Sequence, residues 1–232
     1  MNPVIRPCVA ELVGTFYLCF IGAGSICMNE ALPAGSKIGF IGIALAHGLA
    51  LSVAVSATMA VSGGQLNPAV SIALYITKKI DGARAAAFIG SQLLGALLAG
   101  LFLRWIFPDQ VGGPAFLGTP GIDEPRISPG EAVAIEAVLT FLLLFSIFGT
   151  AVDPRAPKIA GFGIGLTVAF DILVGGPLTG AAMNPARHLG IALAAWHLDR
   201  SWVYWLGPVL GAAAGALVYD RLILEGPKEK PS

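Results

Sequence analysis

Charged side chains are scarce in this chain of 232 residues, at 12% of the total. The 14 Lys and Arg are matched by 14 Asp and Glu, so the formal net charge is zero. A neutral chain lacks the basic surplus that nucleic-acid binding needs, so we expect no nucleic-acid partner. In place of charge the sequence has apolar surface, because 56% of its residues are hydrophobic, as is typical of a membrane protein.

Cysteine and histidine are also rare, with three of each. Cys8, Cys19 and Cys27 lie in or beside the first apolar run and form no CxxC pair, so the sequence predicts neither a metal site nor a disulfide. We interpret them as small buried apolar residues. The few polar residues form no nucleophile–base pair, so we expect no enzymatic activity and no cofactor.

Long apolar runs make up most of the chain. About 20 apolar residues in a helix cross the ~30 Å hydrocarbon core of a bilayer. The first run contains Glu11 and lacks a convincing signal-peptidase site, so we interpret it as a retained span. The sequence predicts an all-α membrane protein with six transmembrane spans at about 7–28, 38–60, 85–107, 131–150, 159–174 and 202–224.

A short motif, Asn-Pro-Ala, occurs twice outside these spans. Its copies consist of Asn67, Pro68, Ala69, Asn184, Pro185 and Ala186. Each copy ends a glycine-containing turn, and the two asparagines are 117 positions apart. Asn is a strong N-cap and Pro is favoured at the first helical position, so each copy predicts the start of a helix.

The apolar segment that follows each motif is only half a span long. It ends near Thr77 in the first copy and near Ala195 in the second, which predicts helices of ten or eleven residues. At 1.5 Å per residue such a helix covers ~16 Å, about half of the hydrocarbon core. A helix N-terminus inside a membrane is costly unless it lines water or a ligand. Broken helices at matching positions of two repeats therefore indicate a transport site.

Positive charge orients the predicted spans. With the N-terminus in the cytoplasm, nine Lys and Arg fall on the inner side and four on the outer side, which favours cytoplasmic location of both termini. The inner set is Arg6, Lys78, Lys79, Arg84, Arg155, Lys158, Arg221, Lys228 and Lys230, and the outer set is Lys37, Arg104, Arg126 and Arg200. The sequence thus predicts one transmembrane domain over residues 1–232, with an inverted repeat at about 7–107 and 131–224.

Two carboxyl groups lie inside predicted spans at corresponding places. Glu11 and Glu136 each precede a threonine by four residues. An ionisable residue in a membrane is expensive and usually faces a polar interior. One interpretation makes both residues proton carriers. The interpretation we prefer makes them structural, with each carboxylate accepting hydrogen bonds from backbone amides of the re-entrant loops.

The paired motifs, the arginine after the second motif and the two glutamates resemble the aquaporin (major intrinsic protein) family over essentially the whole chain. Stretches such as 151–155, 171–177 and 202–208 are most similar to the plant tonoplast intrinsic branch. The resemblance implies a homotetramer in a lipid bilayer, with one pore per subunit. It also implies a four-residue selectivity filter, which counting from the motif asparagines places at His47, Ile172, Ala181 and Arg187.

The resemblance also bears on the solute. Ala192, Tyr204 and Trp205 match the water-type pattern, and His188 stands where serine is usual. The acidic and basic residues of glycerol-type members are missing at positions 188 and 192. We therefore expect a passive channel for water that excludes protons and ions, with ammonia and other small neutral solutes as further candidates. A secondary transporter and a glycerol-type facilitator are the alternatives.

Overall fold

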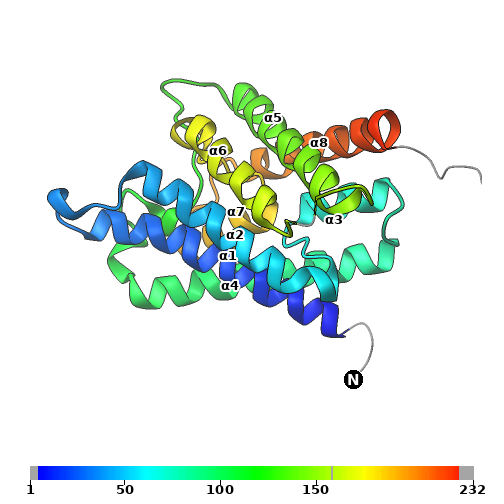
Figure 1. Cartoon of the computed structure of the whole chain (residues 1–232). Coiled ribbons are helices and arrows are strands. Elements are labelled where there is room, and N and C mark those ends of the chain that lie inside the picture. The colour runs from blue at the N-terminus through cyan, green and yellow to red at the C-terminus, as the bar shows by residue number, and fades with distance from the viewer. Residues whose placement is uncertain (1–4, 158, 225–232) are drawn as a thin grey trace, which may run out of the picture.

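The computed structural model describes residues 5–157 and 159–224, and every regular element in these ranges is helical (Figure 1). Five helices are long and apolar enough to cross a membrane: α1 (Ile5–Ala31), α2 (Gly39–Ser62), α4 (Gly82–Ile106), α5 (Pro129–Ile147, continued by a π-turn to Val152) and α6 (Phe162–Thr179). At the sixth predicted span lies α8 (Val203–Val218), which is shorter, with 16 residues, and continues through the π-turn Tyr219–Ile223. The six predicted spans are present.

Two further helices are too short to cross a bilayer. α3 (Pro68–Ile76) has 9 residues and α7 (Pro185–Ala195) has 11. At 1.5 Å per residue they extend ~14 and ~17 Å, about half of a hydrocarbon core. Each begins at the proline of an Asn-Pro-Ala motif, which confirms the two predicted half-helices.

The contacts between helices repeat in the two halves of the chain. α1 packs on α4 and on α2, just as α5 packs on α8 and on α6. α7 packs against α4 of the first half, and α3 packs against α8 of the second. The N-terminal end of α1 and the C-terminal end of α8 lie toward the same side of the molecule, at the right of Figure 1. This arrangement is the predicted inverted repeat, in which each half contributes its half-helix to the other half.

The two halves meet most closely where α2 crosses α6. A Cβ atom on Gly165 would lie 2.1 Å from the carbonyl oxygen of Gly48, and a Cβ on Gly48 would lie 2.5 Å from that of Gly165. Neither position therefore accepts a side chain without moving the helices apart. These glycines are 117 positions apart, the same spacing as the motif asparagines.

The fifth span is longer than its sequence indicated. The predicted end at residue 174 is wrong, because α6 continues through Pro177 to Thr179. Proline near the end of a helix removes only the hydrogen bond to the carbonyl four residues earlier, here Leu173, and leaves the last turn intact. The left-handed Gly180, with φ of 76°, then ends the helix.

Polar and apolar side chains are distributed as in a protein surrounded by lipid. Large apolar side chains remain exposed on the outside, among them Trp105, Val174 and Leu222 at 74%, 69% and 78% exposure. By contrast Glu11 and Glu136 are fully buried. An apolar exterior of this extent needs lipid or a protein partner to cover it. The polar groups are instead buried inside the molecule.

Candidate functional site

The motif asparagines cap the two half-helices. The Oδ1 atom of Asn67 accepts a hydrogen bond from the amide of Ala69 at 2.9 Å. The Oδ1 atom of Asn184 accepts from the amides of Ala186 at 3.0 Å and Arg187 at 3.2 Å. Both asparagines have extended backbone and are followed by proline at the first helical position. This is the local N-cap geometry that the motif predicts.

The same asparagines join the two halves of the molecule. The Nδ2 atom of Asn67 donates to the carbonyl oxygen of Met183 at 2.8 Å, and that of Asn184 donates to the carbonyl oxygen of Leu66 at 2.9 Å. Each side-chain amide has two hydrogens, so one remains on each asparagine. The two helix N-termini therefore face each other across a short distance, with an amide hydrogen to spare on both sides.

The residues before the asparagines have unusual backbone conformations. Leu66 and Met183 both have φ of 51°, a left-handed region that is uncommon for residues other than glycine. This conformation turns the carbonyl groups of both residues toward the opposite asparagine. Neither residue could be recognised from the sequence, since neither side chain signals a positive φ and only their place in the repeat relates them.

Glu11 fixes the loop before α3. Its carboxylate accepts hydrogen bonds from the amides of Gln65 at 3.0 Å and Leu66 at 2.6 Å, and from the hydroxyl of Ser62 at 2.5 Å. The side-chain amide of Gln92 on α4 donates to the same carboxylate at 2.7 Å. Four donors to one fully buried carboxylate hold the strained loop in place and leave the group satisfied.

Glu136 does the same for the loop before α7. It accepts hydrogen bonds from the amides of Ala182 at 2.9 Å and Met183 at 2.7 Å, and from the hydroxyl of Thr179 at 2.7 Å. In both halves the carboxylate thus binds the amide of the left-handed residue that precedes the asparagine. Neither glutamate is among the residues that line the central cavity.

A central cavity brings together six of the ten residues predicted as motif or filter positions, while Pro68, Ala69, Pro185 and Ala186 of the motifs lie outside its lining. It is bordered by His47, Asn67, Ile172, Ala181, Asn184 and Arg187. The space open to the centre of a water molecule measures about 30 Å³. One buried water needs roughly 10–15 Å³ by this measure, so the cavity has room for only a short row of waters. The residues come from α2, α6, α7 and the two loops before the half-helices.

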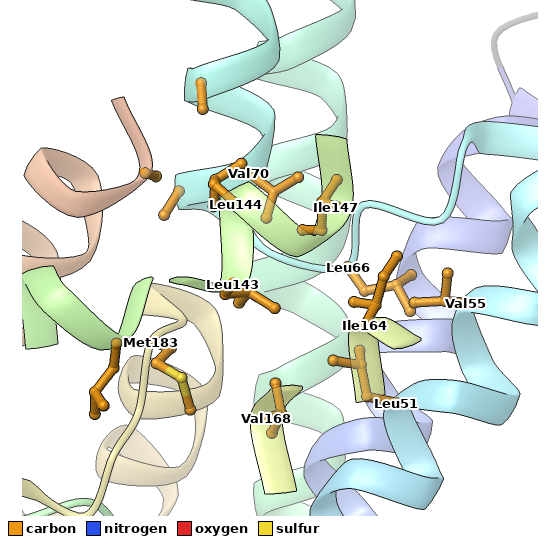
Figure 2. Close-up of a cluster of buried hydrophobic side chains, with 14 of the residues drawn as sticks. Leu51, Val55, Leu66, Val70, Leu143, Leu144, Ile147, Ile164, Val168 and Met183 are labelled. Atoms are coloured by element: carbon orange, nitrogen blue, oxygen red, sulfur yellow. The ribbon is translucent and has the colours of Figure 1, made fainter. Parts of the chain in front are cut away.

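Most of the remaining cavity wall is apolar. Figure 2 shows the side chains of this wall in one cluster with Leu66, Leu144 and Met183. The helices α2, α5 and α6 contribute Leu51, Val55, Leu143, Ile147, Ile164 and Val168 to it. A wall of this kind offers passing water no hydrogen bonds, so the polar contacts are confined to few places.

Arg187 is the cation of the site and is held by two neutral acceptors. It is only 3% exposed, and it donates to the carbonyl oxygen of Gly118 at 3.1 Å and to Nε2 of His47 at 3.0 Å. No carboxylate in the described ranges lies within ion-pair distance of it. A guanidinium has five N–H donors, so three remain beyond these two bonds on a side chain that borders the cavity.

The contact with Arg187 determines the tautomer of His47. Because a guanidinium only donates, Nε2 of His47 must be the acceptor. The hydrogen then resides on Nδ1, which lies 2.9 Å from the carbonyl oxygen of Ile43 and donates to it. The only N–H of this neutral imidazole is therefore used within α2, so His47 supplies no N–H donor to the cavity.

Two buried polar residues, Asp171 and His188, lie outside the cavity lining. Asp171 is buried in α6, and its Oδ2 has no hydrogen-bond partner among the residues described. His188 lies 2.9 Å from the hydroxyl of Ser201 through Nε2 and stacks on Tyr204 with ring centroids 4.0 Å apart. Tyr204 in turn donates to the carbonyl oxygen of Thr179 at 2.8 Å.

The cysteines are all free thiols, with Cys19 and Cys27 buried and Cys8 partly buried. In the described part of the chain, no three His, Cys, Asp or Glu side chains are grouped closely enough to hold a metal ion.

Comparisons with known proteins agree with this architecture. The model of the family described as "Major intrinsic protein" matches residues 2–219. Aquaporin TIP4-4 of Zea mays is 41% identical over 233 residues, covering 98% of this chain and 90% of the relative. Nodulin-26 of Glycine max is 41% identical over 222 residues, covering 94% and 78%.

A solved structure shows the same fold. The aquaglyceroporin from Plasmodium falciparum matches with a TM-score of 0.85 at 26% identity, covering 95% of this chain and 97% of that one. With a family match over nearly its full length and relatives this similar, the chain belongs to the major intrinsic protein (aquaporin) family of membrane channels.

Proposed function

We propose that the protein is a passive channel for water and small neutral solutes such as ammonia, and that it excludes protons and ions. The observation that carries the proposal is the pair of opposed half-helices, whose asparagine amides border a cavity with room for only a few waters. No enzymatic step and no cofactor are part of this proposal.

Proton exclusion follows from the two helix N-termini. Each carries a partial positive charge of about half an elementary charge, so together they repel a cation between them. The free amide hydrogens of Asn67 and Asn184 bind the oxygen of one water. That water accepts from both sides and its hydrogens point away, so it does not relay a proton along the file.

The filter proposed at His47, Ile172, Ala181 and Arg187 sets the solute. Arg187 supplies its donors, because the single N–H of His47 is bound to Ile43. Ile172 and Ala181 form the apolar side. The isoleucine side chain is shorter than a histidine that would reach across the pore toward Arg187, so in this proposal the opening is wider and lets ammonia pass. The glycerol-type alternative is weaker, since the residues that mark that type are absent at positions 188 and 192.

A secondary transporter is disfavoured by the state of the buried acids. Such a protein needs a carboxylate free to exchange protons or ions at the solute site. Glu11 and Glu136 accept four and three hydrogen bonds and lie outside the cavity lining. We therefore propose that both are structural supports of the loops.

We further propose one channel domain over residues 1–232, with inverted repeats at about 7–107 and 131–224, assembled as a homotetramer with both termini in the cytoplasm. The basic residues Lys78, Lys79 and Arg84 follow α3 on the side where its C-terminus lies, which suits the inner surface. Three lysines that contribute to the charge argument, Lys158, Lys228 and Lys230, lie outside the described residues.

The test is paired water and ammonia permeability of the purified protein in liposomes. We expect both fluxes to exceed those of empty liposomes. In Ile172→His the ring narrows and gains a competing hydrogen-bonding group, so the ratio of ammonia to water permeability should fall while water flux persists. Each tenfold change corresponds to about 1.4 kcal/mol of barrier, so one altered contact is measurable. Absence of ammonia flux in the natural protein would restrict the proposal to water.

A further inference from the structure

The imidazole of His47 lies directly against a glycine of α1. A Cβ atom on Gly22 would lie 2.5 Å from Cδ2 and 2.6 Å from Nε2 of His47. Carbon atoms in ordinary contact are ~3.5–4.0 Å apart, so no side chain fits at position 22 while the ring keeps its place. We propose that Gly22 is a specificity-determining position of the pore, which acts by seating His47 against Arg187. This inference rests on the filter of the proposed function.

The position of the imidazole matters because both of its nitrogens form hydrogen bonds. Nδ1 donates to the carbonyl oxygen of Ile43 at 2.9 Å, and Nε2 accepts from Arg187 at 3.0 Å. The edge formed by Cδ2 and Nε2 is the edge that faces Gly22. A methyl group at position 22 displaces this edge by about 1 Å, since it must restore an ordinary contact distance. The bond from Arg187 is then stretched beyond hydrogen-bonding range.

The displaced ring has beside it the cavity that it lines. With only about 30 Å³ available to water there, a shift of the imidazole into the cavity obstructs the file of waters. Arg187 keeps its bond to Gly118 but loses the one to His47, so an additional N–H turns to the cavity. A narrower and more polar constriction lowers the passage of ammonia more than that of water. Gly22 thus sets the solute ratio without contacting the solute.

The experiment is a double-mutant cycle of Gly22→Ala and His47→Ala in liposomes. In Gly22→Ala we expect water permeability to fall by about tenfold and the ratio of ammonia to water permeability to fall as well. In Gly22→Ala/His47→Ala the methyl group no longer meets a ring, so both values should return to those of His47→Ala. Gly90→Ala in α4 is the matched control, because a Cβ there has no atom within 4 Å. It should leave both fluxes unchanged.

Thermal unfolding of the same four variants gives a readout that does not depend on conduction. We expect Gly22→Ala to unfold at a lower temperature than the natural protein, and the double variant to recover. If Gly22→Ala does not fold while the double variant does, the clash with His47 is shown by stability. If both fail to fold, or if Gly22→Ala keeps the natural fluxes and ratio, the proposal is overturned. If the natural protein conducts neither water nor ammonia, the proposed function is overturned instead. The unfolding temperatures of the variants then still decide whether Gly22 positions the ring of His47.

Discussion

At the scale of the residue, each motif asparagine bonds in two directions at once. Oδ1 accepts from the first turn of its own half-helix, and Nδ2 donates to a carbonyl of the opposite loop. Rotating the amide by half a turn would place Nδ2 against backbone N–H groups and lose both bonds. The network therefore assigns the oxygen and nitrogen positions. It also fixes the direction of the one hydrogen that remains on each side.

Replacing Asn184 with Asp separates the capping role from the donor role. Asn184→Asp keeps an oxygen for the amides of Ala186 and Arg187 but places a second oxygen where Nδ2 faced the carbonyl of Leu66. We expect a folded protein with about tenfold lower water flux and a cation leak, because a negative charge now lies between the positive helix ends. Liposome swelling and ion flux measure both effects. Asn29→Asp, at the end of α1, is the control, and unchanged flux without leak in Asn184→Asp would contradict the role of the amide.

Mercurial reagents test the placement of the filter. A mercurial blocks a pore only where a thiol lies at a constriction, and none of the three cysteines lines the cavity. Ala181 does line it. We therefore expect the natural protein to be insensitive and Ala181→Cys to be blocked, with recovery on addition of a reducing thiol. Strong block of the natural protein would show that the narrowest part of the pore lies elsewhere.

At the scale of the element, the half-helices show what sequence can and cannot predict. Their starts are encoded locally, because Asn and Pro specify an N-cap and a first turn within three residues. The positions of the two half-helices within the molecule are not encoded locally. Leu66 and Met183 adopt positive φ only because Glu11 and Glu136 bind their amides from helices more than forty residues away in sequence. The sequence predicted that the two glutamates accept hydrogen bonds from amides of these loops, but no local pattern shows which loop residues they hold in a strained conformation.

The same limit explains other features that the sequence analysis missed. The carbonyl of Gly118, which accepts a hydrogen bond from Arg187, lies in the loop between α4 and α5, where the sequence analysis placed no site residue. The end of α6 was predicted too early, because Gly-Gly-Pro usually breaks a helix and here does not. The proposed filter positions were counted from the motifs through the family resemblance, whereas the tautomer of His47 depends on a contact 140 residues away.

Asp153, which follows the π-turn at the end of α5, accepts hydrogen bonds that make the stability of the protein depend on pH. Hydrogen bonds from the Arg155 side chain, then from its amide, lower the pKa of Asp153 to about 2. The hydroxyl of Tyr219, after α8, also donates to it at 3.3 Å. An unfolded aspartate has a pKa near 3.9. The contribution to stability is therefore present above about pH 4 and is lost as pH falls toward 2.

Thermal unfolding measured from neutral to acidic pH checks this contribution. Asp153→Asn should be less stable than the natural protein at neutral pH, and the difference should shrink as the pH falls from about 5 to about 2. If the difference in unfolding temperature between the natural protein and Asp153→Asn stays constant over this pH range, the charge of the Asp153 carboxylate contributes nothing to stability.

At the scale of the whole molecule, the inverted repeat makes one rigid centre from two halves. Each half-helix packs in the opposite half, and the asparagine bonds cross between the halves in both directions. Where α2 crosses α6, Gly48 and Gly165 bring the backbones into direct contact. Alternating access requires one half to rock against the other around the solute site. Here rocking would break the crossing hydrogen bonds and separate the two glycines.

A rigid centre predicts the form of the transport kinetics. In liposomes that contain the natural protein, water flux should rise in proportion to the osmotic gradient without saturation, because no slow conformational step follows each solute. A proton gradient of either sign should neither drive nor inhibit the flux, since Glu11 and Glu136 are fully bonded away from the cavity. Stopped-flow light scattering gives the water flux, and a pH-sensitive dye inside the liposomes reports proton movement in parallel. Saturating flux, or flux that follows the proton gradient, would instead require a moving element at this centre and would favour the transporter.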